Sequence, residues 1–297
     1  MELKIKNLNK YYGVKHVLKN FTVSLSDGIY GLLGPNGAGK STLMNILTDN
    51  IGFDSGEITY NGENIFELGK NFRKILGYMP QQQCLYESFT AHRFLSYVGA
   101  LKGMKRDYAE ERIDYLLHRV NLADVKNRKL SSFSGGMKQR VMIVQAFLDD
   151  PKVIIMDEPT AGLDPKERIR IRNLISGMSK DKIVIIATHV VSDIEFISKR
   201  ILMLKGGELL YNQSPAELQT MLEGSVFEIK VSEVQVNEIA GKFTVSNIYR
   251  NNDEDIVIRI ITDSEPSGYQ FNAVQPMLED VYLSVFKEES AHKGDKK

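Results

Sequence analysis

The sequence predicts an α/β protein with a largely parallel sheet, and three observations lead to this fold class. Short apolar runs typical of buried parallel strands occur at 29–33, 75–79, 153–156 and 183–187. Segments with helical periodicity follow, as in the apolar stripe expected after Pro165. A glycine-rich phosphate-binding pattern stands between the first apolar run and a helix.

That pattern consists of Gly34, Pro35, Asn36, Gly37, Ala38, Gly39, Lys40, Ser41 and Thr42. It matches G-x-x-x-x-G-K-[ST], in which flexible glycines bring backbone N–H groups close to an anion. The helix that begins there adds unpaired N–H donors and a partial positive charge. We expect Lys40 to reach the β- and γ-phosphates of a nucleotide and the Ser41 hydroxyl to ligate Mg²⁺.

Before this loop, alternating apolar residues at 3–5 and 21–25 predict half-buried antiparallel strands. Tyr11 and Tyr12 lie between these strands, where an aromatic ring either packs on the sheet or stacks on a nucleotide base. Their local sequence favours packing. After the loop, Asn61-Gly62 between apolar alternations predicts a hairpin.

The strand at 75–79 ends in three glutamines, 81–83, which form either a plain polar loop or an amide site for Mg²⁺ or water. From 90 to 130 the pattern becomes helical and predicts an all-α insertion. Its apolar stripe consists of Ile113, Leu116, Leu117 and Val120. The aromatic residues Tyr86, Phe89, Phe94 and Tyr97 are expected in the core, from the usual burial of such side chains.

Ser134, Gly135 and Gly136 begin a further helix, either as an ordinary N-cap or as donors to an anion. Asp157 and Glu158 end a buried strand at the edge where open α/β sheets place their ligands. Asp157 suits Mg²⁺, and Glu158 suits the orientation or deprotonation of a water. His189 ends the next buried strand at the same expected edge.

Length and composition bound the organisation. The 297 residues suit one large domain and an appendage, and the equal numbers of basic and acidic residues, 38 each, give no support for nucleic-acid binding. The N-terminal residues indicate a strand rather than a signal peptide. The single cysteine, Cys84, excludes an internal disulfide and is expected to be an ordinary thiol. Because no apolar run reaches the ~18–20 residues that span a bilayer, a membrane role would need another chain.

A change of pattern near Gly224 predicts the domain organisation. We expect a nucleotide-binding domain at 1–222 with a helical subdomain at about 88–150. An α+β accessory domain at 223–286 and a disordered tail at 287–297 follow.

In their order, GPNGAGKST, Gln81, FSGGMKQR, IIMDEP, AGLD and His189 resemble the ATP-binding subunit of an ABC transporter over residues 1–220. The resemblance implies a P-loop NTPase core of the RecA-like type with an antiparallel β subdomain and an α-helical subdomain. It also implies ATP hydrolysis with Mg²⁺.

The resemblance assigns roles to residues of this sequence. It makes Tyr12 the base-stacking aromatic, which reverses the local preference. It makes Glu158 the catalytic base and His189 the switch residue at the γ-phosphate. It assigns contacts with Mg²⁺ to Ser41, Gln81 and Asp157, and a permease-sensing role to Gln81.

Four further residues, Ser134, Gly135, Gly136 and Asp164, are implied at the interface of an ATPase dimer. The first three match the signature sequence, which closes on the ATP of the opposite subunit, and Asp164 matches the loop that couples the two sites. Phe133 and Met137 depart from the family's Leu-Ser-Gly-Gly-Gln and bear on the fine tuning of that interface.

The implied partners are a second ATPase subunit and an integral-membrane permease, at the cytoplasmic face of the membrane. The segment 81–97 resembles the surface that receives the permease's coupling helix, so some of its aromatic residues are interface candidates. The C-terminal segment resembles ABC-2-type bacterial exporter ATPases of the drug, peptide or bacteriocin-immunity kind.

Three alternatives stay open. A soluble ABC-family ATPase that acts on nucleic acid or ribosomes would carry two sets of motifs or a long coiled coil, whereas this chain has one set and no sustained heptads. An importer ATPase of the sugar-transporting kind would carry a longer regulatory domain. A non-hydrolysing regulatory binder would lack Glu158 or His189.

Overall fold

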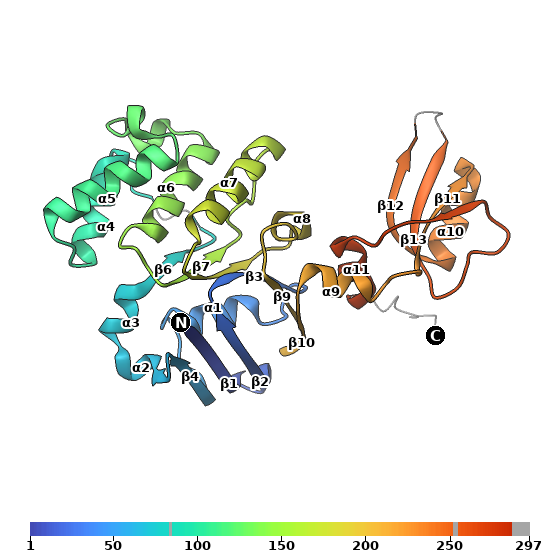
Figure 1. Cartoon of the computed structure of the whole chain (residues 1–297), viewed down its shortest axis with the longest axis horizontal. Helices are drawn as coiled ribbons and strands as arrows, with labels where there is room; N and C mark the ends of the chain where they lie inside the picture. Colours follow the sequence, from blue (N-terminus) through green and yellow to red (C-terminus); the bar gives the residue numbers. More distant parts are fainter. Residues whose placement is uncertain (83–84, 252–254, 287–297) are drawn as a thin grey trace, which may run out of the picture. The chain divides into compact units, whose positions relative to one another are not determined.

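The structure is a computed structural model that describes residues 1–82, 85–251 and 255–286. The expectations for Cys84 and for the tail 287–297 lie outside these residues. The chain divides into two compact units, Met1–Asn212 and Gln213–Lys297 (Figure 1).

A six-stranded sheet forms the centre of the first unit, in the order β10-β9-β3-β8-β7-β6. Its strands are β3 (Gly28–Leu33), β6 (Leu76–Met79), β7 (Val153–Asp157), β8 (Ile183–Ala187), β9 (Arg200–Lys205) and β10 (Glu208–Gln213). The pairs β3–β8, β3–β9, β6–β7 and β7–β8 are parallel. The carboxyl ends of β3, β6, β7 and β8 therefore meet at one edge of the sheet.

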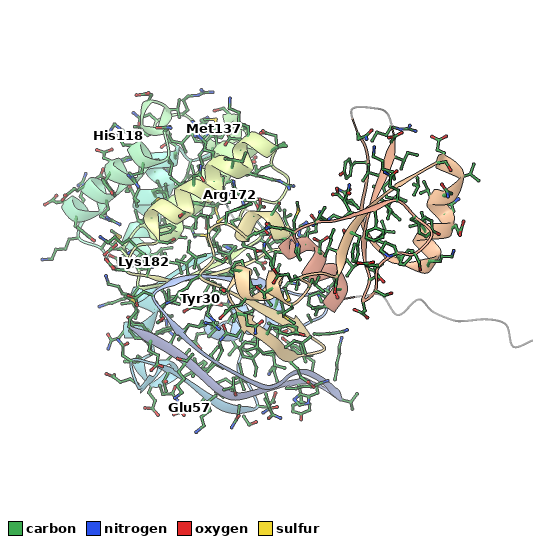
Figure 2. The ribbon with its side chains drawn as sticks, turned by 45° about the vertical axis from the view of Figure 1, so that its right-hand side comes forward. Tyr30, Glu57, His118, Met137, Arg172 and Lys182 are labelled. Carbon is green, nitrogen blue, oxygen red and sulfur yellow. The ribbon has the colours of Figure 1, made fainter. Side chains whose placement is uncertain are left out.

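An antiparallel sheet in the order β2-β1-β4-β5 lies in the same unit. It contains β1 (Glu2–Tyr12), β2 (Lys15–Ser26), β4 (Ser55–Tyr60) and β5 (Glu63–Asn64). The strands β1 and β2 alternate buried and exposed residues, and their apolar faces share one core with Tyr30 of β3 (Figure 2). Asn61 and Gly62 both have positive φ at the β4–β5 turn, so the predicted hairpin is confirmed.

The helices of the first unit are α1 (Lys40–Leu47), α2 (Ile65–Leu68), α3 (Lys70–Ile75), α4 (Ala91–Leu101), α5 (Arg106–Arg119), α6 (Gly135–Phe147), α7 (Pro165–Met178) and α8 (Val191–Ile194). Of these, α4 and α5 lie within the all-α insertion predicted at 90–130. Helices α4, α5 and α6 pack on one another (Figure 1). The predicted apolar stripe of α5 and the following residue Val120 is buried against them. Two short 3₁₀ turns, Ala123–Val125 and Leu130–Ser132, join α5 to α6.

The second unit is an α+β fold around an antiparallel sheet in the order β12-β13-β11-β14. Its elements are α9 (Pro215–Thr220), β11 (Val226–Val231), α10 (Val236–Lys242), β12 (Thr244–Arg250), β13 (Ile256–Ile261), β14 (Phe271–Ala273) and α11 (Leu278–Val285), with a 3₁₀ turn at Glu233–Gln235. Alternating apolar residues at 227–231 and 256–260 predict β11 and β13, and the apolar stripe at 278–285 predicts α11. The sequence does not indicate β12, whose residues from Asn247 onward are exposed and carry no alternating apolar pattern.

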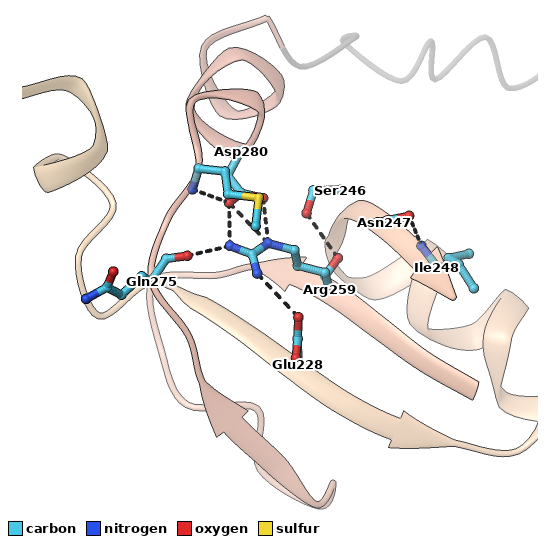
Figure 3. Close-up of polar contacts among 8 residues, drawn as sticks. Glu228, Ser246, Asn247, Ile248, Arg259, Gln275 and Asp280 are labelled. Atoms are coloured by element: carbon cyan, nitrogen blue, oxygen red, sulfur yellow. Dashed lines mark hydrogen bonds and ion pairs between the residues drawn. The ribbon is translucent and has the colours of Figure 1, made fainter. Parts of the chain in front are cut away.

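A buried ion pair joins α11 to this sheet (Figure 3). The Arg259 guanidinium of β13 donates from Nη2 to Asp280 Oδ2 at 2.8 Å and to the Gln275 carbonyl at 2.6 Å. The Met277 N–H also donates to Asp280 Oδ2, at 2.8 Å, and caps the helix. Arg259 is 6% exposed and Asp280 1% exposed, so each charge depends on its partner for solvation.

The packing division lies before α9, because α9 packs against α11 within the second unit. The expected functional boundary at 222/223 lies after this helix. As a division of function, that boundary stays a prediction.

Candidate functional site

The glycine-rich loop connects β3 to α1 at the carboxyl edge of the parallel sheet. Gly39 is the N-cap of α1 with φ 109°, a conformation that L side chains rarely adopt. A Cβ atom there would lie 3.0 Å from the Val17 carbonyl and closer still to the Leu18 side chain. Only glycine therefore fits where the chain enters the helix, and the first N–H groups of α1 are left open to an anion.

The Lys40 ammonium lies within this loop, where Nζ donates to the carbonyls of Gly34 at 2.5 Å and Pro35 at 3.2 Å. Burial lowers the Lys40 pKa, and the carboxylates of Glu158 and Asp157 act in the opposite direction. The lysine of the loop therefore interacts electrostatically with Asp157, at the end of β7, and with Glu158, which follows it.

A pocket of about 270 Å³ covers the loop. Its lining consists of Tyr12, Lys15, Val17, Asn36, Gly37, Ala38, Gly39, Lys40, Ser41 and Thr42. Tyr12 lines this pocket with a half-exposed ring, whereas the Tyr11 ring stacks on His16 at 4.0 Å between centroids. The geometry thus favours Tyr12 for base stacking. Lys15 also lines the pocket, although no motif in the sequence marks it.

Asp157 and Glu158 end β7 beside the carboxyl end of β8. Burial and the neighbouring Glu158 charge raise the pKa of Asp157 to about 6, although Lys40 opposes the shift. Negative charge at this point is therefore incompletely balanced by the residues that surround it.

The Glu158 carboxylate is held by two residues that follow β8. Oε1 accepts from the His189 N–H at 3.0 Å and lies 2.8 Å from His189 Nδ1, and Oε2 accepts from the Thr188 hydroxyl at 3.2 Å. Glu158 is buried, whereas the His189 side chain is 66% exposed. The two predicted residues meet, and the pair can orient a water between a base and a ring nitrogen.

Ser134 caps α6, where its hydroxyl accepts from the Met137 N–H at 3.3 Å. Ser134 and Gly135 are exposed, and Met137 follows in the first turn (Figure 2). Asp164 caps α7 in the same way and accepts from the Glu167 N–H at 3.0 Å. Neither helix start contributes to the lining of the phosphate-loop pocket, as far as the described residues show.

Gln81 follows β6, the neighbour of β7, at the same edge of the sheet, and it is exposed. Gln83 lies outside the described residues. Within the described chain, no group of three or more His, Cys, Asp and Glu residues could hold a metal by itself. The donor set nevertheless fits Mg²⁺, because Ser41 and Asp157 offer hard oxygens and Asp157 carries poorly balanced charge.

An aromatic cluster lies at the start of the helical insertion, made of Tyr86, Phe89, Phe94 and Tyr97. Phe94 is buried, as expected for a core residue. The expectation is wrong for Tyr86 and Tyr97, which are 50% and 41% exposed. Tyr86 precedes α4 and Tyr97 lies on it, and both rings contact Phe89 while part of each ring stays exposed to solvent.

None of the helices in the described part of the chain has the length and apolar character needed to span a bilayer.

Comparisons with known proteins extend these observations. The family model described as ABC transporter matches residues 18–161. The linearmycin resistance ATP-binding protein LnrL of Bacillus subtilis is 30% identical over 95% of this chain and 97% of its own length. The Nod factor export ATP-binding protein I of Rhizobium etli is 32% identical over 94% of this chain and 91% of its own length.

A solved structure is also similar, the dimeric ATP-binding cassette MJ0796 in a post-hydrolysis state bound to ADP and Pi. It superposes with a TM-score of 0.62 at 29% identity, over 71% of this chain and 98% of that chain. The fold class predicted from the sequence is thereby confirmed.

Proposed function

The chain belongs to the family of ABC transporter ATP-binding proteins and hydrolyses ATP, and on this premise we propose that it drives export through a separate membrane permease. The proposal of export rests on two relatives that match along more than nine-tenths of the chain. Their names describe linearmycin resistance and Nod factor export.

In the proposed mechanism two ATPase subunits enclose two ATP molecules. The phosphate loop of one subunit binds the β- and γ-phosphates through its N–H groups and Lys40. The exposed start of α6, at Ser134 and Gly135, supplies donors to the ATP of the opposite subunit. Support for this division comes from the phosphate-loop pocket, whose described lining contains no residue of that helix start.

Within each site, Glu158 accepts a proton from the attacking water. His189, whose Nδ1 lies 2.8 Å from Glu158 Oε1, orients the carboxylate and faces the γ-phosphate. Ser41, Asp157 and Gln81 are the proposed residues for Mg²⁺, which would balance charge on the phosphates when bound. Tyr12 stacks on the base, and Asp164 joins the two sites at the dimer interface.

The proposed permease contact is the cluster of Tyr86, Phe89 and Tyr97, together with Arg93, whose guanidinium lies 4.1 Å from the Phe89 ring centroid. Exposed aromatic residues beside an arginine are typical of interface centres. This contact would place the chain on the cytoplasmic face of a membrane.

Copurification from native membranes tests the proposal. We expect an integral-membrane permease to copurify with the wild-type chain, without an extracytoplasmic solute-binding protein of the kind that an importer would use. Tyr97→Glu should abolish the copurification while ATP hydrolysis by the purified ATPase dimer continues. Tyr115→Glu, at a similarly exposed tyrosine of α5, is the matched control.

Recovery of the wild-type chain as a monomer or homodimer, under conditions that preserve membrane complexes, would contradict the permease proposal. Recovery with ribosomes or nucleic acid would instead favour the soluble ATPase alternative.

A further inference from the structure

Glu158 has an unusual backbone for a residue with a long side chain. Its φ is 51°, in the left-handed region that non-glycine residues rarely adopt. Such a conformation is unfavourable for a residue with a side chain and persists only where surrounding contacts enforce it. The contacts that enforce this backbone conformation therefore also determine the orientation of the Glu158 carboxylate.

Three segments hold this backbone. The Glu158 N–H donates to the Ala187 carbonyl of β8 at 2.8 Å, and the Glu158 carbonyl accepts from the Ala161 N–H at 3.2 Å. The third contact comes from α6, where Gln139 Nε2 donates to the Pro159 carbonyl at 2.6 Å and lies 3.5 Å from the Glu158 carbonyl. This third contact links the acid to α6, the helix that Ser134 caps.

The chemistry of the Gln139 site suits this role. Gln139 is 4% exposed, so its amide depends on protein partners. Both groups that face its nitrogen are carbonyl acceptors, which fixes the NH₂ toward the loop after β7. Its distance from the helix start is also short, since five residues of α-helix separate Gln139 from Ser134 and span about 7.5 Å.

We propose that Gln139 is a positioning residue that holds Glu158 in its left-handed conformation and relays the position of the signature helix to the Glu158 carboxylate. When phosphate binds at Ser134 and Gly135, a displacement of α6 moves the Gln139 amide and with it the peptide of Glu158 and Pro159. Hydrolysis is thereby sensitive to whether the opposite subunit's ATP is in place. The inference rests on the proposed role of Glu158 as base.

The test replaces the Gln139 amide and separates ATP binding from turnover. Gln139→Leu removes the donor at similar volume, and Gln139→Asn keeps an amide that is one methylene too short to reach both carbonyls. We expect kcat to fall by about 10- to 100-fold in both variants, as for a misplaced catalytic group. The Kd for ATP should stay within about 3-fold, because the phosphate-loop pocket does not include Gln139.

The variants should also accumulate an ATP-bound dimer, since slow chemistry leaves the closed state intact. A merely structural role would lower ATP affinity, dimer formation and thermal stability together. Gln145→Leu is the control on the same helix, at a half-buried glutamine whose side chain makes no hydrogen bond with the described residues.

Wild-type kcat in either folded variant would overturn the inference, and the Asn variant decides if the Leu variant does not fold. Loss of ATP binding in parallel with kcat would overturn it as well. Hydrolysis by Glu158→Gln distinguishes failure of the Gln139 proposal from failure of the proposed function. Unchanged hydrolysis in this variant would contradict the role of Glu158 as base.

Discussion

At the scale of single residues, Tyr11 and Tyr12 are neighbours with different surroundings. Tyr12 lines the phosphate-loop pocket, and Tyr11 is stacked on His16. Because aromatic stacking contributes about 0.5–1.5 kcal/mol, Tyr12→Ala should raise the Kd for ATP by about 3- to 10-fold. Tyr11→Ala, the matched control, should change it by less than about 2-fold in calorimetric titration. A larger effect of Tyr11→Ala would show that Tyr11, rather than Tyr12, makes the base contact.

The raised pKa of Asp157 predicts a pH dependence. Its folded value of about 6 lies above the unfolded value of about 3.9, so the folded state binds more protons between these pH values. The contribution of this group to stability is complete below pH ~4 and is lost as the pH rises through about 6.

Asp157→Asn removes that loss, because asparagine stays neutral. In buffer without nucleotide and Mg²⁺, the Tm of the variant minus the Tm of the wild type should rise from pH 5 to pH 8. A Tm difference that stays constant over this range would show that ionisation of Asp157 does not destabilise the fold.

At the scale of elements, the pairing of α11 with β13 predicts a local stability effect. Asp280→Ala leaves the buried Arg259 guanidinium without its main partner, and breaking a buried pair in this way costs about 3–5 kcal/mol. Hydrogen exchange in the full chain should therefore accelerate in β11 and β13 but not in β7 and β8. Asp263→Ala, at an exposed position after β13, is the control. Unchanged exchange in β13 would mean that Arg259 does not depend on Asp280.

Much of each element was predictable because its signal is local. The alternation in β1 and β2, the glycine-rich loop and the stripe of α5 each lie within a short window of sequence. The exposed strand β12 lacks such a signal, and the exposure of Tyr97 depends on which face of α4 the fold covers. The ion pair of Arg259 and Asp280 joins two residues that lie 21 positions apart, on β13 and α11. No local sequence pattern indicates it.

At the scale of the whole molecule, the motifs predicted candidate site residues but not the contacts that support them. The contact between Glu158 and His189 was predictable, because both residues follow parallel strands that end at the same edge of the sheet. The contact of Gln139 with Pro159 was not, because it depends on how α6 packs over that edge. The left-handed backbone of Glu158 was equally hidden, since glutamate gives no sign of such a conformation.

The central claim is that one chain carries only half of each working site, so hydrolysis requires a second subunit. Light scattering of Glu158→Gln tests this most directly, because the variant should bind ATP and Mg²⁺ without completing the reaction. The account predicts a 33.6 kDa monomer without nucleotide and a stable species of about twice that mass with ATP. A variant that stays monomeric at saturating ATP, or that hydrolyses ATP at the wild-type rate, would contradict it.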